Sequence, residues 1–280
     1  MKFLTNHAVF VVLVLILDVP IIFGDESRAN RQGAAVADAE TVERETVERE
    51  TVDPDAVAML QAEVAEQLKL ALRKLPMEID DHAADAVQQY SARGDVRFFS
   101  GQFQEAVDDY RAMVRIDPRL DASHWRLGIA FFYAGKPKEA ASQFDKYHSF
   151  DDVDRENGIW RYFSHHRAFG PDLARKELLR YAKDDRPPFP EVYQLFEGRM
   201  TPDQVLAAIP ADAPDRNSRL FYSELYVGLN EVVLGKNEAA KPHLANSILN
   251  PWPRQAGYGP SYMWHVGRLQ YLELVNPRQK

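Results

Sequence analysis

The chain of 280 residues contains no cysteine. This absence excludes disulfide bonds, thiolate zinc sites, cysteine nucleophiles and the lipid-attachment cysteine of exported lipoproteins. The sequence also lacks an HExxH pair, a glycine-rich phosphate loop and a GxSxG nucleophile elbow. His165 and His166 are adjacent, so on a helix they would point about 100° apart and could not hold one ion together. These absences favour a binding protein that has no catalytic residues, no cofactor and no metal site.

Basic residues are fewer than acidic residues and are scattered along the chain. The formal net charge is −8, so the overall field repels nucleic acid and anionic membrane surfaces. Between Asp25 and Asp55, ten carboxylates stand against four arginines, and the motif TVERE occurs twice in succession at 41–50. This segment has too few large apolar groups to form a core. We expect residues 25–53 to be an acidic disordered linker, either a solvated spacer or a surface for a basic partner.

The longest apolar run of the chain lies at its N-terminus. Lys2 precedes an uninterrupted apolar stretch at 8–17, and Gly24 offers a small residue for cleavage. Asp18 and Pro20 break the run, which makes it short for a membrane-spanning helix. We therefore expect residues 1–24 to be the signal peptide of an exported protein, periplasmic or extracellular. The alternative is an uncleaved membrane anchor formed by residues 8–23.

An amphipathic helix is predicted over residues 54–76. Asp53 suits the N-cap, Pro54 suits the first helical position and Pro76 ends the pattern. The apolar residues that fall at helical spacing are Val57, Leu60, Val64, Leu68, Leu72 and Leu75. This stripe has to be covered. It either packs on the following helices of the chain or pairs with a second copy, as a homodimer through residues 55–75.

Four landmark residues recur after 34 positions. Gly94, Gly101, Ala106 and Tyr110 return as Gly128, Gly135, Ala140 and Phe144. The first glycine lets two helices approach closely, and the second allows the positive φ of a tight turn. The alanine leaves room for the aromatic residue that fills the seam between the helices. A period of 34 is typical of a helix-turn-helix repeat.

Residues 87–154 resemble the tetratricopeptide repeat family in both spacing and residue type. A third unit, which extends the array over 87–188, is degenerate and keeps Ala174 at the alanine position. Prolines then interrupt the array, and residues 189–210 form a proline-rich connection with short helices. A TPR-like fourth unit at 221–251 has the same internal offsets, carried by Gly228, Gly235 and Ala240. Residues 261–275 form a last amphipathic helix that would cap the array.

The resemblance implies an all-α fold, a right-handed α-solenoid of helix-turn-helix units between an N-terminal helix and a C-terminal capping helix. It also implies that the first helix of each unit lines a concave groove that binds peptides or helices. The groove positions we expect to contact a partner are Phe98, Phe99, Trp125, Ile129, Phe132 and Tyr133. The alternative is that a helix of the same chain, such as residues 55–75, fills this groove.

The sequence thus predicts a non-catalytic scaffold or adaptor of the cell envelope, similar in design to exported bacterial tetratricopeptide proteins. The expected partner is a protein or peptide and not a nucleic acid, and a membrane only if the N-terminal segment stays uncleaved. The lysine and asparagine that hold a terminal carboxylate in some family members are absent, since Trp125 and Ile129 occupy those positions. Two other functions stay open: self-association through residues 55–75, and an enzyme with a site near 187–210.

Overall fold

The computed structural model describes residues 53–276. Within this range all regular secondary structure is helical, and there is no strand. The all-α prediction is therefore confirmed. The predicted signal peptide or anchor and residues 25–52 of the predicted linker lie outside the described residues. Between residues 53 and 276, no helix has both the length and the apolar character needed to cross a membrane.

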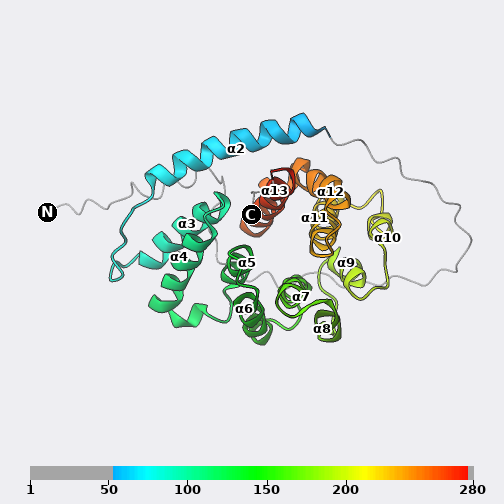
Figure 1. Cartoon of the computed structure of the whole chain (residues 1–280), viewed down its shortest axis with the longest axis horizontal. Coiled ribbons are helices and arrows are strands. Elements are labelled where there is room, and N and C mark those ends of the chain that lie inside the picture. The colour runs from blue at the N-terminus through cyan, green and yellow to red at the C-terminus, as the bar shows by residue number, and fades with distance from the viewer. Residues whose placement is uncertain (1–52, 277–280) are drawn as a thin grey trace, which may run out of the picture.

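The helices follow one another around the molecule, and the last one returns to contact the first part of the ring (Figure 1). In chain order they are α2 (Pro54–Lys74), α3 (Ala86–Phe99), α4 (Phe103–Ile116), α5 (Trp125–Tyr133), α6 (Pro137–Phe150), α7 (Arg155–Phe169), α8 (Pro171–Lys176), α9 (Phe189–Phe196), α10 (Pro202–Ala207), α11 (Arg216–Val233), α12 (Asn237–Leu249) and α13 (Tyr258–Val275). Two short 3-10 turns, Pro118–Leu120 and Trp252–Arg254, join neighbouring helices. The most extensive contacts are between chain neighbours, such as α3 with α4 and α11 with α12.

Three helix pairs share one close approach. In each pair a glycine on the first helix touches a large side chain of the second, so that an added Cβ atom would be too close to it. The Cβ would lie 2.6 Å from Tyr110 if added at Gly94 and 2.7 Å from Phe144 if added at Gly128. At Gly228 it would lie 2.8 Å from Leu244. In each pair the seam residue follows the glycine by the same number of positions. The pairs α3–α4, α5–α6 and α11–α12 therefore pack in the same way. The space left by the glycine on one helix is filled by a large side chain of the next helix.

The turns of these pairs are also alike. Their glycines have positive φ angles, 76° at Gly101, 73° at Gly135 and 77° at Gly235, a conformation that other residues adopt at a cost. The alanines that follow the turns, Ala106, Ala140 and Ala240, are each 0% exposed. The expected roles of glycine in the turn and of alanine in the seam match the geometry found at these positions.

The pair α7–α8 departs from this pattern. Tyr162 stands where the other pairs have their seam glycine, and α8 ends after six residues. Ala174 is nevertheless buried, at 1% exposure. A proline-containing loop then leads to α9, which packs against α7 and α11. The shortened second helix leaves room beside α7 that the loop and α9 occupy.

The helix α2 lies across one side of the molecule, from α3 at one end to α12 at the other (Figure 1). Its inward residues are Val57, Gln61, Val64, Leu68 and Ala71. The Gln61 amide and Arg268 of α13 exchange two hydrogen bonds, of 3.2 and 3.1 Å. The buried part of the apolar stripe is thus covered within one chain, which corresponds to the first of the two arrangements that the sequence allowed.

His124 illustrates how burial of a polar residue makes stability depend on pH. Its Nδ1 accepts a hydrogen bond from the Leu127 N–H at 3.2 Å and so caps α5. Burial lowers the pKa of His124 to about 3. Between pH 6.5 and 3 the unfolded chain therefore takes up a proton that the folded chain does not, and stability falls as the pH falls.

A His124→Asn variant should remove this dependence, because asparagine also caps helices but does not titrate. At about 1.4 kcal/mol per pH unit, the free energy of unfolding should drop by about 2 kcal/mol less than in the wild type between pH 7 and pH 5. Urea unfolding at the two pH values measures this. His82→Asn, at an exposed histidine, serves as the control and should behave like the wild type. An equal drop in all three proteins would show that His124 is not the group responsible.

Candidate functional site: a polar pocket between α7 and α9

Three of the residues expected to line a groove pack against α13. Phe98 stacks on Tyr262 with ring centroids 5.1 Å apart, and Phe99 stacks on His265 at 3.9 Å. Trp125 meets the edge of Tyr262 at 4.8 Å. Phe98, Phe99, Ile129 and Phe132 are each at most 3% exposed, whereas Trp125 and Tyr133 are half-buried. The helix α13 thus covers part of this surface, and Phe132 lies instead against Trp160 and Phe163 of α7, with ring centroids 5.6 and 6.4 Å apart.

A buried polar network joins α3, α5 and α13 beside these aromatic rings. Asp95 accepts hydrogen bonds from Arg126 at 2.7 Å and from the hydroxyls of Tyr110 and Tyr258 at 2.6 Å each. Arg126 also donates to Ser91 at 2.9 Å. Asp95 offsets the charge of Arg126, and the network ties α13 to α3 and α5.

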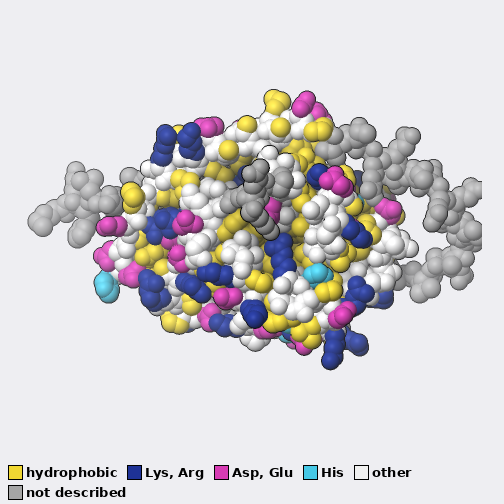
Figure 2. Space-filling view, viewed as in Figure 1, with side chains coloured by type: hydrophobic (Ala, Val, Ile, Leu, Met, Phe, Trp, Pro, Cys, Tyr) yellow, Lys and Arg dark blue, Asp and Glu magenta, His cyan; other side chains and the backbone are white. Residues whose placement is uncertain are grey.

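Charged side chains form no continuous stripe on the face of the molecule that Figure 2 shows. Basic and acidic side chains alternate around the rim, and apolar groups are scattered among them (Figure 2). A depression near the middle of this face contains basic side chains. No group of three or more histidine, aspartate and glutamate side chains within residues 53–276 is arranged to hold a metal ion.

A pocket of about 250 Å³ lies beside the start of α7, next to the loop that leads to α9. It is lined by Arg155, Tyr181, Asp184, Pro190, Tyr193, Gln194, Glu197 and Arg199. Most of these residues are polar or charged. The pocket lies where the helix pairs are interrupted, close to the segment 187–210 in which the sequence left a site open.

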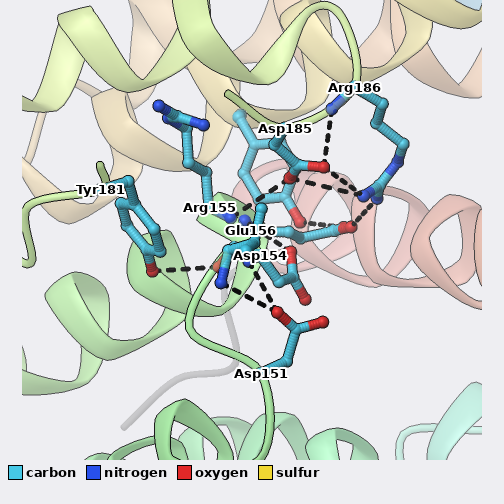
Figure 3. A network of polar contacts seen from close by, with 9 residues as sticks. Asp151, Asp154, Arg155, Glu156, Tyr181, Asp185 and Arg186 are labelled. Carbon is cyan, nitrogen blue, oxygen red and sulfur yellow. Dashed lines mark hydrogen bonds and ion pairs between the residues drawn. The ribbon is translucent and has the colours of Figure 1, made fainter. Parts of the chain in front are cut away.

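Carboxylates hold the start of α7 in position (Figure 3). Asp154 caps the helix by accepting from the Glu156 N–H at 2.9 Å. Asp151 accepts from the Asp154 N–H at 3.1 Å, and Asp185 accepts from the Arg155 N–H at 3.2 Å. Burial, with Glu156 nearby, raises the pKa of Asp154 to about 7. These backbone contacts fix Arg155 at the first helical position of α7.

Arg186 pairs with two of the carboxylates behind the pocket, Glu156 and Asp185. Arg186 donates to Glu156 at 2.7 Å, and the hydroxyl of Tyr226 donates to the other oxygen of Glu156. The Arg155 guanidinium points away from this cluster (Figure 3). Arg155 lines the pocket.

The Arg155 side chain is only 9% exposed, yet most of its donors are unused. Its Nη2 donates to Asp184 at 3.1 Å, whereas its Nη1 is buried and has no hydrogen-bond partner in the described part of the chain. The guanidinium also lies over the ring of Tyr181, 5.3 Å from the centroid. A buried donor without a partner is unfavourable, so this guanidinium is suited to bind an additional acceptor.

Two tyrosines form the walls of the pocket. The hydroxyl of Tyr181 donates to the Asp154 carbonyl at 3.0 Å, and that of Tyr193 donates to the Leu179 carbonyl at 2.8 Å. Burial raises the pKa of both hydroxyls. Both rings are thus fixed as protonated donors, and neither hydroxyl is available as a base. Arg199, whose side chain is 63% exposed, lies at the rim and pairs with Glu197.

Reasoning from the sequence missed this pocket because it looked for ligands along the aromatic first helices. The available signal was the charged stretch at 180–190 directly before the break in the repeat. No protein-family model matches the chain. Its likeness to tetratricopeptide repeats therefore depends on the spacing of the recurring residues and on the geometry of the helix pairs.

Proposed function

We propose that the chain is a non-catalytic scaffold of tetratricopeptide type, exported to the cell envelope, that binds a segment of a partner protein. The observation that carries this proposal is the shared geometry of three helix pairs, with one glycine in each seam and one in each turn. Stacked pairs of this kind form an array with an extended surface that serves binding. The surface repeats along the array and encloses no reaction site.

Within this proposal the units at 87–188 and 221–251 form a right-handed α-solenoid, and α13 is its capping helix. The contacts of α13 with α12 and α3 support this role, as does its burial of Tyr262 and Met263. The helix α2 is a second cover, because it contacts both α3 and α12. With both helices in place, the aromatic groove residues stabilise the fold and do not receive the partner.

We place the partner segment at the pocket between α7 and α9. Two features support this position: a guanidinium whose buried Nη1 lacks a partner, and tyrosine walls fixed by hydrogen bonds to the backbone. Binding sites gain affinity when their walls are already ordered before the ligand arrives. The pocket lies at the break in the array, so a partner there contacts residues that the regular units do not provide.

Capture from an envelope extract with a matched pair of variants tests this placement. Gln194→Trp puts a large side chain in the pocket lining, and Ser142→Trp adds the same side chain at an exposed position of α6. The wild type and Ser142→Trp should retain the same protein, and Gln194→Trp should lose it. Equal retention by all three baits would contradict the placement.

A further inference from the structure

We propose that the pocket between α7 and α9 binds an aspartate or glutamate side chain of the partner segment, held by the guanidinium of Arg155. This inference rests on the proposed function and adds the chemistry of the bound group. It concerns a site away from the aromatic groove, on a residue at the start of α7. A carboxylate is the ligand whose two oxygens match the parallel N–H groups of an arginine.

The donors of Arg155 show that the pocket has capacity for such a group. A guanidinium carries five N–H donors in a fixed fork. Asp184 accepts from Nη2 alone, at 3.1 Å, and Nη1 has no partner among residues 53–276. A carboxylate that is not restrained by the backbone of residue 184 can bind both Nη atoms. The incoming group thus satisfies one more donor than the internal one does.

Asp184 marks the place where the carboxylate binds. Its carboxylate already accepts a hydrogen bond from Arg155, so a carboxylate fits at this position of the pocket. The Asp184 side chain is 84% exposed, and ion pairs with so exposed a partner contribute little to stability. Displacement of Asp184 into solvent is therefore easy, and the fold does not depend on the pair.

The charged side chains of the lining form two pairs of opposite sign. Asp184 and Glu197 are each paired with an arginine of the pocket, Arg155 and Arg199. No unpaired carboxylate of the lining is left to attract a cation, while Arg155 has a spare donor. The same two carboxylates would repel a doubly charged group such as phosphate more strongly than a carboxylate.

The volume of the pocket fits one side chain. About 250 Å³ is below the range of roughly 300–1,000 Å³ that holds drug-sized ligands and cofactors. The rings of Tyr181 and Tyr193 contact each other edge to face, with centroids 5.3 Å apart, and together form one apolar side of the pocket for the methylene groups of a glutamate. Gln194 and the exposed Arg199 at the rim can contact the backbone of the same segment.

Three short peptides test the inference on the whole protein by calorimetry, backed by NMR shifts of the pocket residues. They are acetyl-Ala-Ala-Glu-Ala-Ala-amide, the same peptide with Gln, and acetyl-pentaalanine with a free terminal carboxylate. We expect the Glu peptide to bind in the millimolar range and the Gln peptide to bind at least tenfold more weakly. If the terminal carboxylate binds more tightly than Glu, the side-chain source is wrong.

Asp184→Asn is the decisive variant because it removes the competing carboxylate from an exposed position. It should increase the affinity for the Glu peptide several-fold and leave the affinity for the Gln peptide unchanged. Asp108→Asn, the same change of charge on α4, should alter neither affinity. Failure of Asp184→Asn to tighten the Glu peptide overturns the inference, as does failure of the Glu peptide to bind in the millimolar range.

The peptide results also separate this inference from the proposed function. If the Glu and Gln peptides bind equally and Gln194→Trp abolishes both, the pocket receives partner segments but does not select a carboxylate. If the Glu peptide binds equally to the wild type and Gln194→Trp, the pocket is not the site, and both proposals fail.

Discussion

An Ala140→Glu variant should fail to form a stable fold. Ala140 is 0% exposed and lies on α6 in the seam of the α5–α6 pair, where Phe144 fills the space at Gly128. A glutamate there overfills the seam and buries an ionised group without a partner. The loss should be at least about 4 kcal/mol, a large part of the 5–15 kcal/mol that stabilises a typical domain.

The measurement is far-ultraviolet circular dichroism during urea unfolding, with Ser142→Glu as the control on the same helix. Ser142 is exposed, so its substitution should change the free energy of unfolding by less than about 0.5 kcal/mol. If Ala140→Glu unfolded with the wild-type midpoint, the seam described here would be wrong.

An Asp109→Ala variant should lose about 3–5 kcal/mol of stability, because it leaves buried cations without their counter-ion. The Asp109 side chain is 2% exposed and pairs with Arg93 and Arg97, at 2.7 Å in each case. Arg93 also donates to the carbonyls of Pro76 and Met77, which ties α3 to the end of the α2 segment. Loss of the carboxylate therefore loosens the attachment of α2 as well.

Thermal unfolding and hydrogen exchange measure the two consequences. Asp108→Ala removes an exposed carboxylate from the neighbouring position and should leave the midpoint close to that of the wild type. Asp109→Ala should lower the midpoint strongly and speed exchange in α2. An unchanged midpoint would mean that the pair contributes no net stability.

The parts of the fold that could be predicted from the sequence are those set by local spacing. Gly94 and Gly128 recur with their seam residues at one fixed offset, and the helix pairs follow from that offset alone. The start of α2 at Pro54 follows from the Asp53 cap, which accepts from the Asp55 N–H at 3.0 Å. Short-range rules are sufficient at such positions.

Arrangements that depend on distant partners could not be predicted in the same way. Phe98 and Tyr262 are far apart in the sequence, so nothing near either residue shows that α13 covers the aromatic surface. The same holds for Gln61 and Arg268, which join α2 to α13. Arg93 likewise has its carboxylate partner, Asp109, on the next helix.

The pocket escaped prediction for a related reason. Arg155, Tyr181 and Tyr193 come from α7, a loop and α9, and they meet only because α8 is short. Where the spacing of the recurring residues is interrupted, the sequence does not show which side chains will meet. The pair α7–α8 and the loop after it are thus the part of the chain where the sequence pattern predicts least and where the structure adds most.

Site-specific photo-cross-linking in cells tests the central claim most directly. A photoreactive phenylalanine analogue is placed at Gln194 in the pocket lining or at Lys138, an exposed residue of α6. A partner segment that occupies the pocket should give a discrete cross-linked product from position 194 and none from position 138. Equal products from both positions, or none from position 194, would contradict the account.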